Sequence, residues 1–297
     1  MTARFYFHNS RNMEIESHPL TTDQLASLAH PNRLAVSRLQ IRRFPAKVAA
    51  GDISVALSHK PNTTSAYLSN LRQAGLITQS RQGNSLLYCA NLEGLRGMFD
   101  MLLTGCCQNR PDICMPGSAA GPALPTPERP LKVLFICTGN AARSIMAESL
   151  LKTLGEGKFQ AYSAGTRPGT GPNTGPAPRV LSLLAEKGHD TSTLSSKTLA
   201  AFSGPDAPQM DFVFTVCDHA ANEECPAWPG QPMSAHWGMP DPLQVKGSAV
   251  ERGLALQQCY GLLKRRITAF AALPFEALDR ISLQHQSDAI GTLTSET

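Results

Sequence analysis

KVLFICTGNAARSIMAE, residues 132–148, decides the fold of the second half of this 297-residue chain. Its apolar start, Lys132 to Cys137, predicts a buried strand, and Arg143 begins a stretch that predicts a helix. A loop between a strand and a helix can turn its backbone amides towards an anion at the positive end of the helix. The sequence therefore predicts an oxyanion-binding loop consisting of Thr138, Gly139, Asn140, Ala141, Ala142, Arg143 and Ser144.

The chemistry of this loop centres on Cys137, a candidate nucleophile at the end of the predicted strand. Arg143 can bind a tetrahedral oxyanion through two hydrogen bonds at once, and Ser144 can donate to the sulfur. We expect the loop amides, the helix end and Arg143 to lower the pKa of Cys137 towards the thiolate form. Gly139 and Asn140 tolerate the left-handed backbone that such a loop needs.

Strand and helix patterns alternate through the rest of the second half. Further strands are predicted at 160–163 and 211–216, and helices at 143–154, 179–187 and 253–273. This order predicts an α/β three-layer domain with helices on both faces of a parallel sheet. Active sites of such sheets lie beyond the carboxyl ends of the strands. Cys137 and Cys217 both follow a strand end, so we expect them to lie near each other.

The first half predicts a winged helix-turn-helix, which is mainly helical. Its expected helices cover 22–29, 31–43, 51–57, 62–74 and 92–107, and its expected hairpin joins strands at 77–80 and 86–89. Five prolines in residues 116–130 predict a semi-extended linker. The expected organisation is a winged-helix domain (19–115), this linker (116–130), the α/β domain (131–275) and a C-terminal tail (276–297) with some helical spacing.

Charge and cysteine content restrict the class of protein. Residues 19–115 contain ten Lys and Arg against five Asp and Glu, whereas residues 131–297 contain fourteen against fifteen. The basic excess in the first half favours a polyanionic partner there. Eight cysteines without a secretion signal favour reduced thiols in the cytoplasm. No apolar run is long enough to predict a membrane span.

Two further motifs accompany the loop in the second half of the chain: SAGT at residues 163–166 and HWGMPDP at residues 236–242. With VLFICTGNAARSIMAE, they resemble the low-molecular-weight tyrosine phosphatase fold, and in particular its arsenate-reductase branch, over residues 131–275. The resemblance implies that Cys137 attacks arsenate, which is reduced to arsenite. It also implies that Asp241, beside Pro242, is the general acid that protonates the leaving oxygen.

A reductase of this kind needs further thiols, because a second sulfur must attack the first one and expel arsenite. Cys217 is the candidate for that step, and Cys225 could then attack Cys217 and carry the disulfide outward. The order of this relay is left open. No cofactor is expected to be bound for catalysis; an external thiol reductant is expected, either thioredoxin or glutathione with glutaredoxin.

The first half resembles the ArsR/SmtB family of metal-responsive repressors, over residues 25–114. LAHPNRL at 28–34 and SNLRQAGL at 69–76 carry most of this resemblance, which implies operator DNA as a partner and a homodimer formed through the winged helix. Leu68 and Leu71 share the buried face of the expected recognition helix. The candidate DNA contacts are Thr63, Ser65, Ala66, Tyr67, Arg72 and Arg81.

Three cysteines near the end of the last helix of this half form a candidate arsenite site. Trivalent arsenic is a soft ion that three thiolates suffice to bind, and the candidates are Cys106, Cys107 and Cys114. Zinc normally takes four ligands, and Cys89 could be recruited only if the fold brings it close. A zinc site and unreactive thiols are the alternatives to arsenite as inducer.

The leading interpretation is therefore a bifunctional protein, an arsenite-responsive repressor joined to an arsenate reductase. One alternative is a tyrosine phosphatase that carries a winged helix, although residues after Arg143 offer no aromatic wall for a phenyl ring. Another is a transcription factor whose second domain binds oxyanions without turnover. A winged helix that serves only for dimerisation is a further possibility.

Overall fold

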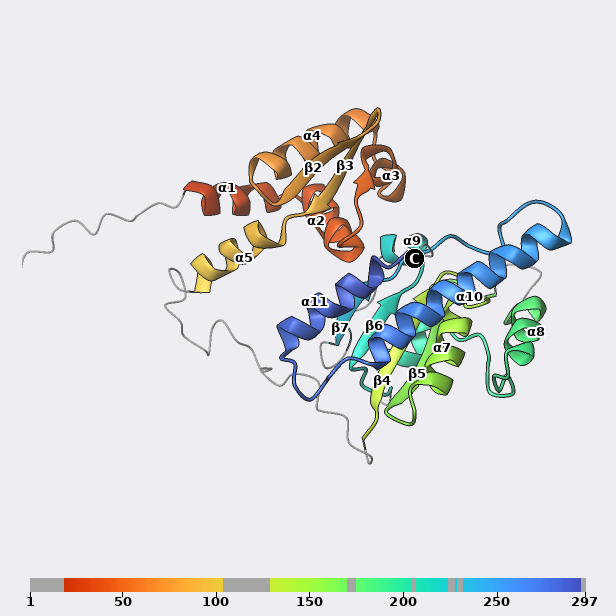
Figure 1. The fold of residues 1–297 in the computed structure, drawn as a ribbon. Coiled ribbons are helices and arrows are strands. Elements are labelled where there is room, and N and C mark those ends of the chain that lie inside the picture. The colour runs from red at the N-terminus through yellow and green to blue at the C-terminus, as the bar shows by residue number, and fades with distance from the viewer. Residues whose placement is uncertain are drawn as a thin grey trace, which may run out of the picture.

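The computed structural model describes residues 19–103, 129–169, 175–203, 207–223, 228 and 232–294. Two separate groups of buried apolar side chains divide these residues into a smaller domain and a larger one. In Figure 1 the smaller domain lies above the larger one. Within the described ranges, no helix is both long and apolar enough to cross a membrane.

The smaller domain is a winged helix-turn-helix, as the sequence predicts. Its elements are α1 (Pro19–Leu28), α2 (Pro31–Arg43), β1 (Val48–Ala49), α3 (Ala50–Ala56), α4 (Pro61–Gln73), β2 (Ile77–Gln82), β3 (Ser85–Ala90) and α5 (Leu92–Met101). The three strands pair antiparallel in the order β1-β3-β2. Leu68 and Leu71 of α4 are fully buried against Val36 and Leu39 of α2 in one core. The two-residue β1 is too short to leave a pattern in the sequence.

The larger domain has the predicted parallel sheet. Its elements are β4 (Leu131–Cys137), α7 (Arg143–Leu154), β5 (Phe159–Gly165), α8 (Pro178–Glu186), a 3-10 turn (Leu199–Phe202), β6 (Phe212–Thr215), α9 (Asp218–Asn222), β7 (Met233–His236), α10 (Ala249–Ala271) and α11 (Arg280–Gly291). The strand order is β5-β4-β6-β7, and every pair is parallel. The apolar run of the central strand β4 is buried because helices cover the sheet.

The last strand and the last helix complete this domain. β7 adds a fourth strand that the sequence pattern did not predict. α11 lies along β7, its Leu283 is buried in the core of the larger domain, and the indole nitrogen of Trp237 donates to the Ser287 carbonyl at 2.9 Å. The described part of the expected tail, residues 276–294, thus packs on the α/β domain. Trp237 itself is fully buried and stacks on Phe214, with ring centres 4.1 Å apart.

Candidate active site

The loop between β4 and α7 wraps around the Cys137 sulfur. Asn140 takes a left-handed conformation (φ 47°), whereas Gly139 does not. The Asn140 backbone amide donates to the Cys137 sulfur at 3.2 Å, and the Asn140 side chain donates to the Ser144 hydroxyl at 2.8 Å. The Lys197 amide donates to the Asn140 side-chain oxygen at 2.7 Å. Asn140 therefore fixes the loop in the shape that encloses the nucleophile.

Cys137 is 2% exposed, and its sulfur lies 2.9 Å from the Ser144 hydroxyl. Burial raises the pKa of the Cys137 thiol; hydrogen bonds from Ser144 and the charge of Arg143 oppose this rise, and the nearby Cys217 adds to it. Arg143 and the start of α7 thus act in the expected direction, but burial outweighs them, and the expected net lowering of this pKa is wrong. The free energy lost by removing the thiolate from water is larger here than the free energy gained from the neighbouring hydrogen-bond donors and from Arg143.

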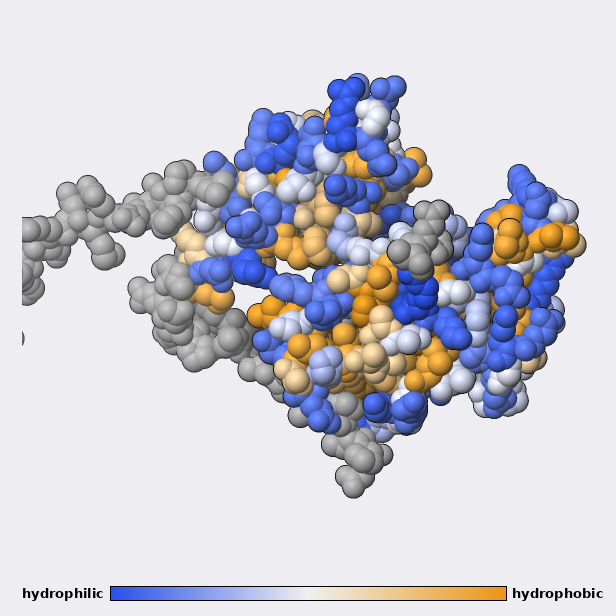
Figure 2. Space-filling model, viewed as in Figure 1, coloured by the Kyte–Doolittle hydropathy of each residue, from blue (hydrophilic) through white to orange (hydrophobic). Residues whose placement is uncertain are grey.

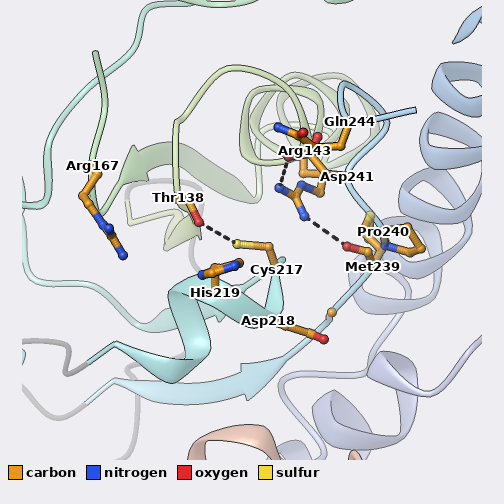
Figure 3. A pocket seen from close by; sticks show the side chains of 11 residues that line it. Thr138, Arg143, Arg167, Cys217, Asp218, His219, Met239, Pro240, Asp241 and Gln244 are labelled. Carbon is orange, nitrogen blue, oxygen red and sulfur yellow. Dashed lines mark hydrogen bonds and ion pairs between the residues drawn. The ribbon is translucent and has the colours of Figure 1, made fainter. Parts of the chain in front are cut away.

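Arg143, at the start of α7, pairs with the residue expected to act as the acid. Its guanidinium lies 2.7 Å from an Asp241 carboxylate oxygen and donates to the Met239 carbonyl at 3.1 Å. The Arg143 side chain is 10% exposed and that of Asp241 is 30% exposed. Asp241 thus stands at the mouth of the loop, where its carboxylate engages the group that would bind an oxyanion (Figure 3).

The SAGT motif has a steric role beside this loop. Gly165 ends β5 where a Cβ atom would lie 2.8 Å from the Thr138 carbonyl oxygen and 3.1 Å from the Asn140 amide nitrogen. Any larger residue would push the loop away from the strand. The amides of Thr166 and Arg167 then donate to the carbonyls of Cys137 and Thr138.

Cys217 lines the same cleft as this loop and lies two residues after β6. Its sulfur is 3.4 Å from the Thr138 hydroxyl and accepts from the Ala220 amide at 3.4 Å, so Cys217 caps α9. The cleft has a volume of about 830 Å³. Figure 3 shows the Cys217 sulfur directed at Thr138, with Arg143 directed at Asp241 and Met239. Cys225 lies outside the described residues.

Other lining residues of the cleft were not expected from the sequence. They are Arg167, Asp218, His219 and Gln244, which join Thr138, Arg143 and Cys217 and, from the HWGMPDP motif, Gly238, Met239, Pro240 and Asp241. Arg167 follows the SAGT motif directly and forms an ion pair with Glu223, and its position after that motif was the one available signal. None of the described lining residues is Phe, Tyr or Trp.

The candidate DNA contacts lie on α4 and the β2–β3 hairpin. Ser65, Ala66, Arg72 and Arg81 are exposed, and Thr63 is half-buried. Tyr67, the remaining candidate contact, is held by neighbouring side chains. Its ring lies beside those of His30 and His59, and its hydroxyl accepts from the Asn32 side chain at 3.2 Å.

The candidate arsenite ligands Cys106, Cys107 and Cys114 lie outside the described residues. Cys89 is buried, with its sulfur 3.6 Å from the Pro45 carbonyl oxygen. Among the residues that the structure describes, no three His, Cys, Asp or Glu side chains are grouped as metal ligands would be.

Comparison with known proteins gives similarities for both halves of the chain. An arsenate reductase of Halalkalibacterium halodurans is 32% identical over 139 residues, which are 47% of this chain and 94% of that protein. A solved arsenate reductase in a phosphate-binding state is 26% identical, with a TM-score of 0.37, and covers 48% of this chain and 97% of its own. An ArsR-like regulator from Rhodococcus sp. RHA1 is 18% identical, with a TM-score of 0.27, and covers 30% of this chain and 82% of its own.

The sequence model of one family matches the α/β domain. It is the model of the low molecular weight phosphotyrosine protein phosphatases, and it matches residues 132–283, slightly more than half of the chain. The match includes the Cys137 loop, Cys217 and the Asp241 segment, which the fold brings together at one cleft. The chain therefore belongs to the low molecular weight phosphotyrosine protein phosphatase family.

Proposed function

We propose that this protein reduces arsenate to arsenite, with Cys137 as nucleophile and Cys217 and Cys225 as a thiol relay. The observation that carries the proposal is the position of two thiols at the carboxyl ends of the neighbouring parallel strands β4 and β6, with the Thr138 hydroxyl beside Cys217. An oxyanion hydrolase needs one thiol at this cleft, whereas a reductase needs a second one within reach. The name shared by the similar proteins points to the same reaction.

In the first step, the loop amides and Arg143 bind arsenate, and the Cys137 thiolate attacks the arsenic. A sulfur–arsenic bond forms, and one arsenate oxygen leaves as water after protonation. We assign this proton to Asp241, whose carboxylate lies 2.7 Å from Arg143 and takes up a proton from solvent before it acts as the acid. Arg143 cannot bind arsenate fully while it pairs with Asp241. Substrate binding therefore separates the Asp241 carboxyl group from the guanidinium.

In the second step, the Cys217 thiolate attacks the Cys137 sulfur. The sulfur–arsenic electron pair goes to arsenic, which is reduced from As(V) to As(III) and leaves as arsenite, while the two thiols become a disulfide. Cys225 then attacks Cys217 and releases Cys137 as a thiol. An external dithiol, such as thioredoxin, or glutathione with glutaredoxin, reduces the remaining disulfide.

The decisive experiment uses fully reduced protein and arsenate without an external reductant. About one arsenite released per chain with two thiols lost is expected for a thiol relay, and no release is expected from Cys137→Ser. Cys217→Ser should form the arsenic adduct without releasing arsenite. Sustained hydrolysis of p-nitrophenyl phosphate without arsenite formation would replace the reductase with a phosphatase, although the described cleft offers no aromatic wall.

We further propose that the winged helix is an arsenite-responsive repressor that binds operator DNA as a homodimer. Exposed Ser65, Ala66, Arg72 and Arg81 support DNA binding, and the exposed Leu25 of α1 and Phe99 of α5 offer apolar surface for a second copy. Arsenite would bind Cys106, Cys107 and Cys114 and weaken DNA binding. If the triple Cys→Ser protein still releases DNA at the same arsenite concentration, the inducer site lies elsewhere.

A further inference from the structure

Helix α2 of the winged helix contacts the short helix α9 that follows Cys217. The Arg42 guanidinium donates to the Ala221 carbonyl at 2.9 Å and to the Asn222 carbonyl at 3.3 Å. These carbonyls belong to the last turn of α9, where no further helical amide can reach them. An arginine there both completes their hydrogen bonds and offsets the negative end of the helix.

Arg43, the next residue of α2, reaches both ends of the same helix. Its guanidinium donates to the Asn222 side-chain oxygen at 3.1 Å and lies 2.8 Å from an Asp218 carboxylate oxygen. The Arg43 side chain is only 10% exposed. A charge buried to this degree is costly without its partners, so Arg43 favours the arrangement in which α9 is formed and docked.

Helix α9 depends on such contacts because it has only five residues. An isolated helix of that length is not stable in water. Inside the larger domain, the Cys217 sulfur caps its first turn, and Asp218 bonds to His236 at 3.1 Å. His236 and Arg43 together lower the pKa of Asp218, so this carboxylate is ionised where the guanidinium meets it.

We propose that Arg42 and Arg43 are positioning residues of the reductase site: from the winged helix they hold α9, and through α9 they hold the Cys217 thiol at the cleft. The inference rests on the proposed function, because that function makes Cys217 the second thiol. It gives the winged helix a part in the reductase reaction. By reciprocity, a change at Cys217 that loosens α9 must loosen the docking of α2 by the same free energy.

The test compares the full-length Arg42→Gln/Arg43→Gln protein with the wild type in the reduced state. Iodoacetamide labelling, followed by peptide mass spectrometry, gives separate rate constants for Cys217 and Cys137. Cys217 is 1% exposed, so opening of α9 should increase its rate of labelling. We expect Cys217 to react roughly tenfold faster, the factor that corresponds to losing a hydrogen bond with a charged group, while Cys137 keeps its rate.

The matched control is Arg96→Gln, which removes an exposed arginine from α5 of the same domain and should change neither rate. Unchanged Cys217 labelling in the double variant would overturn the proposal. An equal increase at both cysteines would also overturn it, because it would show general loosening of the domain.

If the double arginine variant folds poorly, a second comparison uses single substitutions instead. Arg43→Gln and Asn222→Ala each remove one partner of the 3.1 Å hydrogen bond, so their effects on the Cys217 rate should be non-additive. Additive effects would count against the proposed contact. Failure of the proposed function gives a different result: no Cys217 disulfide would form after arsenate, although labelling without arsenate would still respond to the arginines.

Discussion

Among single residues, Ser144 has the clearest predicted effect on the nucleophile. Its hydroxyl lies 2.9 Å from the Cys137 sulfur and opposes the rise in pKa that burial causes. Ser144→Ala should therefore raise the Cys137 pKa further above the ordinary 9.0 and lower the thiolate fraction at pH 8. Alkylation of Cys137 at that pH should slow by about tenfold.

Ser149→Ala is the control for this prediction. Ser149 lies on the same helix and is buried, and among the described residues its hydroxyl has no hydrogen-bond partner. It should leave the pH profile of Cys137 alkylation unchanged. A Ser144→Ala profile that coincides with that of the wild type would show that the serine does not stabilise the thiolate.

Asp241 gives a second prediction for a single residue, because its carboxylate engages the oxyanion-binding Arg143. Asp241→Asn removes both the acid and a negative charge from the mouth of the loop. Turnover should fall by about a hundredfold or more, whereas inhibition by phosphate should become stronger. Steady-state kinetics with phosphate as competitor separates the two effects; weaker phosphate binding would show that Asp241 helps to hold the anion.

Among the elements, α11 makes the stability of the larger domain depend on pH. Its Asp288 is 8% exposed, and burial raises its pKa to about 6. Because the folded-state pKa lies above the ordinary 3.8, this term favours folding fully below pH 3.8, and the stabilisation is lost as pH rises through about 6. The difference is at most about 3 kcal/mol.

Asp288→Asn should therefore raise the melting temperature at pH 7.5 and have a smaller effect at pH 5. Asp279 caps the same helix, and hydrogen bonds with Ser282 lower its pKa, whereas the pKa of Asp288 is raised. Asp279 is therefore a control whose ionised form stabilises the fold. Asp279→Ala should lower the melting temperature at pH 7.5. Thermal unfolding of both proteins across pH checks the pair; an Asp288→Asn effect that does not vary with pH would contradict the assignment.

The elements that the sequence predicts are those with long apolar patterns. β4 and α7 match the expected 132–137 and 143–154 closely, since an apolar run and a helical repeat mark them. β7 was missed because its four residues, Met233–His236, show no pattern that separates them from a loop. α9 was also missed because it has only five residues. Part of its stability comes from contacts with a distant segment, which no local pattern shows.

The sequence predicted the location of the candidate site, because its two cysteines lie at the ends of predicted strands. Parallel pairing of β4 with β6 brings Cys137 and Cys217 near each other, as their positions at two strand ends indicated. The direction of the Cys137 pKa change was not predictable, because it depends on how deeply the loop is buried. Likewise, the pairing of Arg143 with Asp241 joins residues 98 positions apart and needs the folded chain.

In the whole molecule, the winged helix presents two different faces. α2 docks on α9 of the larger domain, whereas α4 and the β2–β3 hairpin lie on the side away from it (Figure 1). The surface over α4 and the hairpin tip is largely hydrophilic (Figure 2). The contacts that dock α2 and the proposed DNA contacts therefore involve different arginines, and the two sets can be tested separately.

Arg72→Gln and Arg81→Gln should each weaken DNA binding several-fold. Each should also reduce the slope of log affinity against log salt by about 0.9, the value for one phosphate contact. Arg42→Gln/Arg43→Gln removes two positive charges from the docked face, so its salt slope should match that of the wild type. Titrations with a duplex selected by the reduced protein from a random pool measure both quantities. Equal loss of slope in all three proteins would mean that α2 also faces DNA, and the docked arrangement could then not persist on the operator.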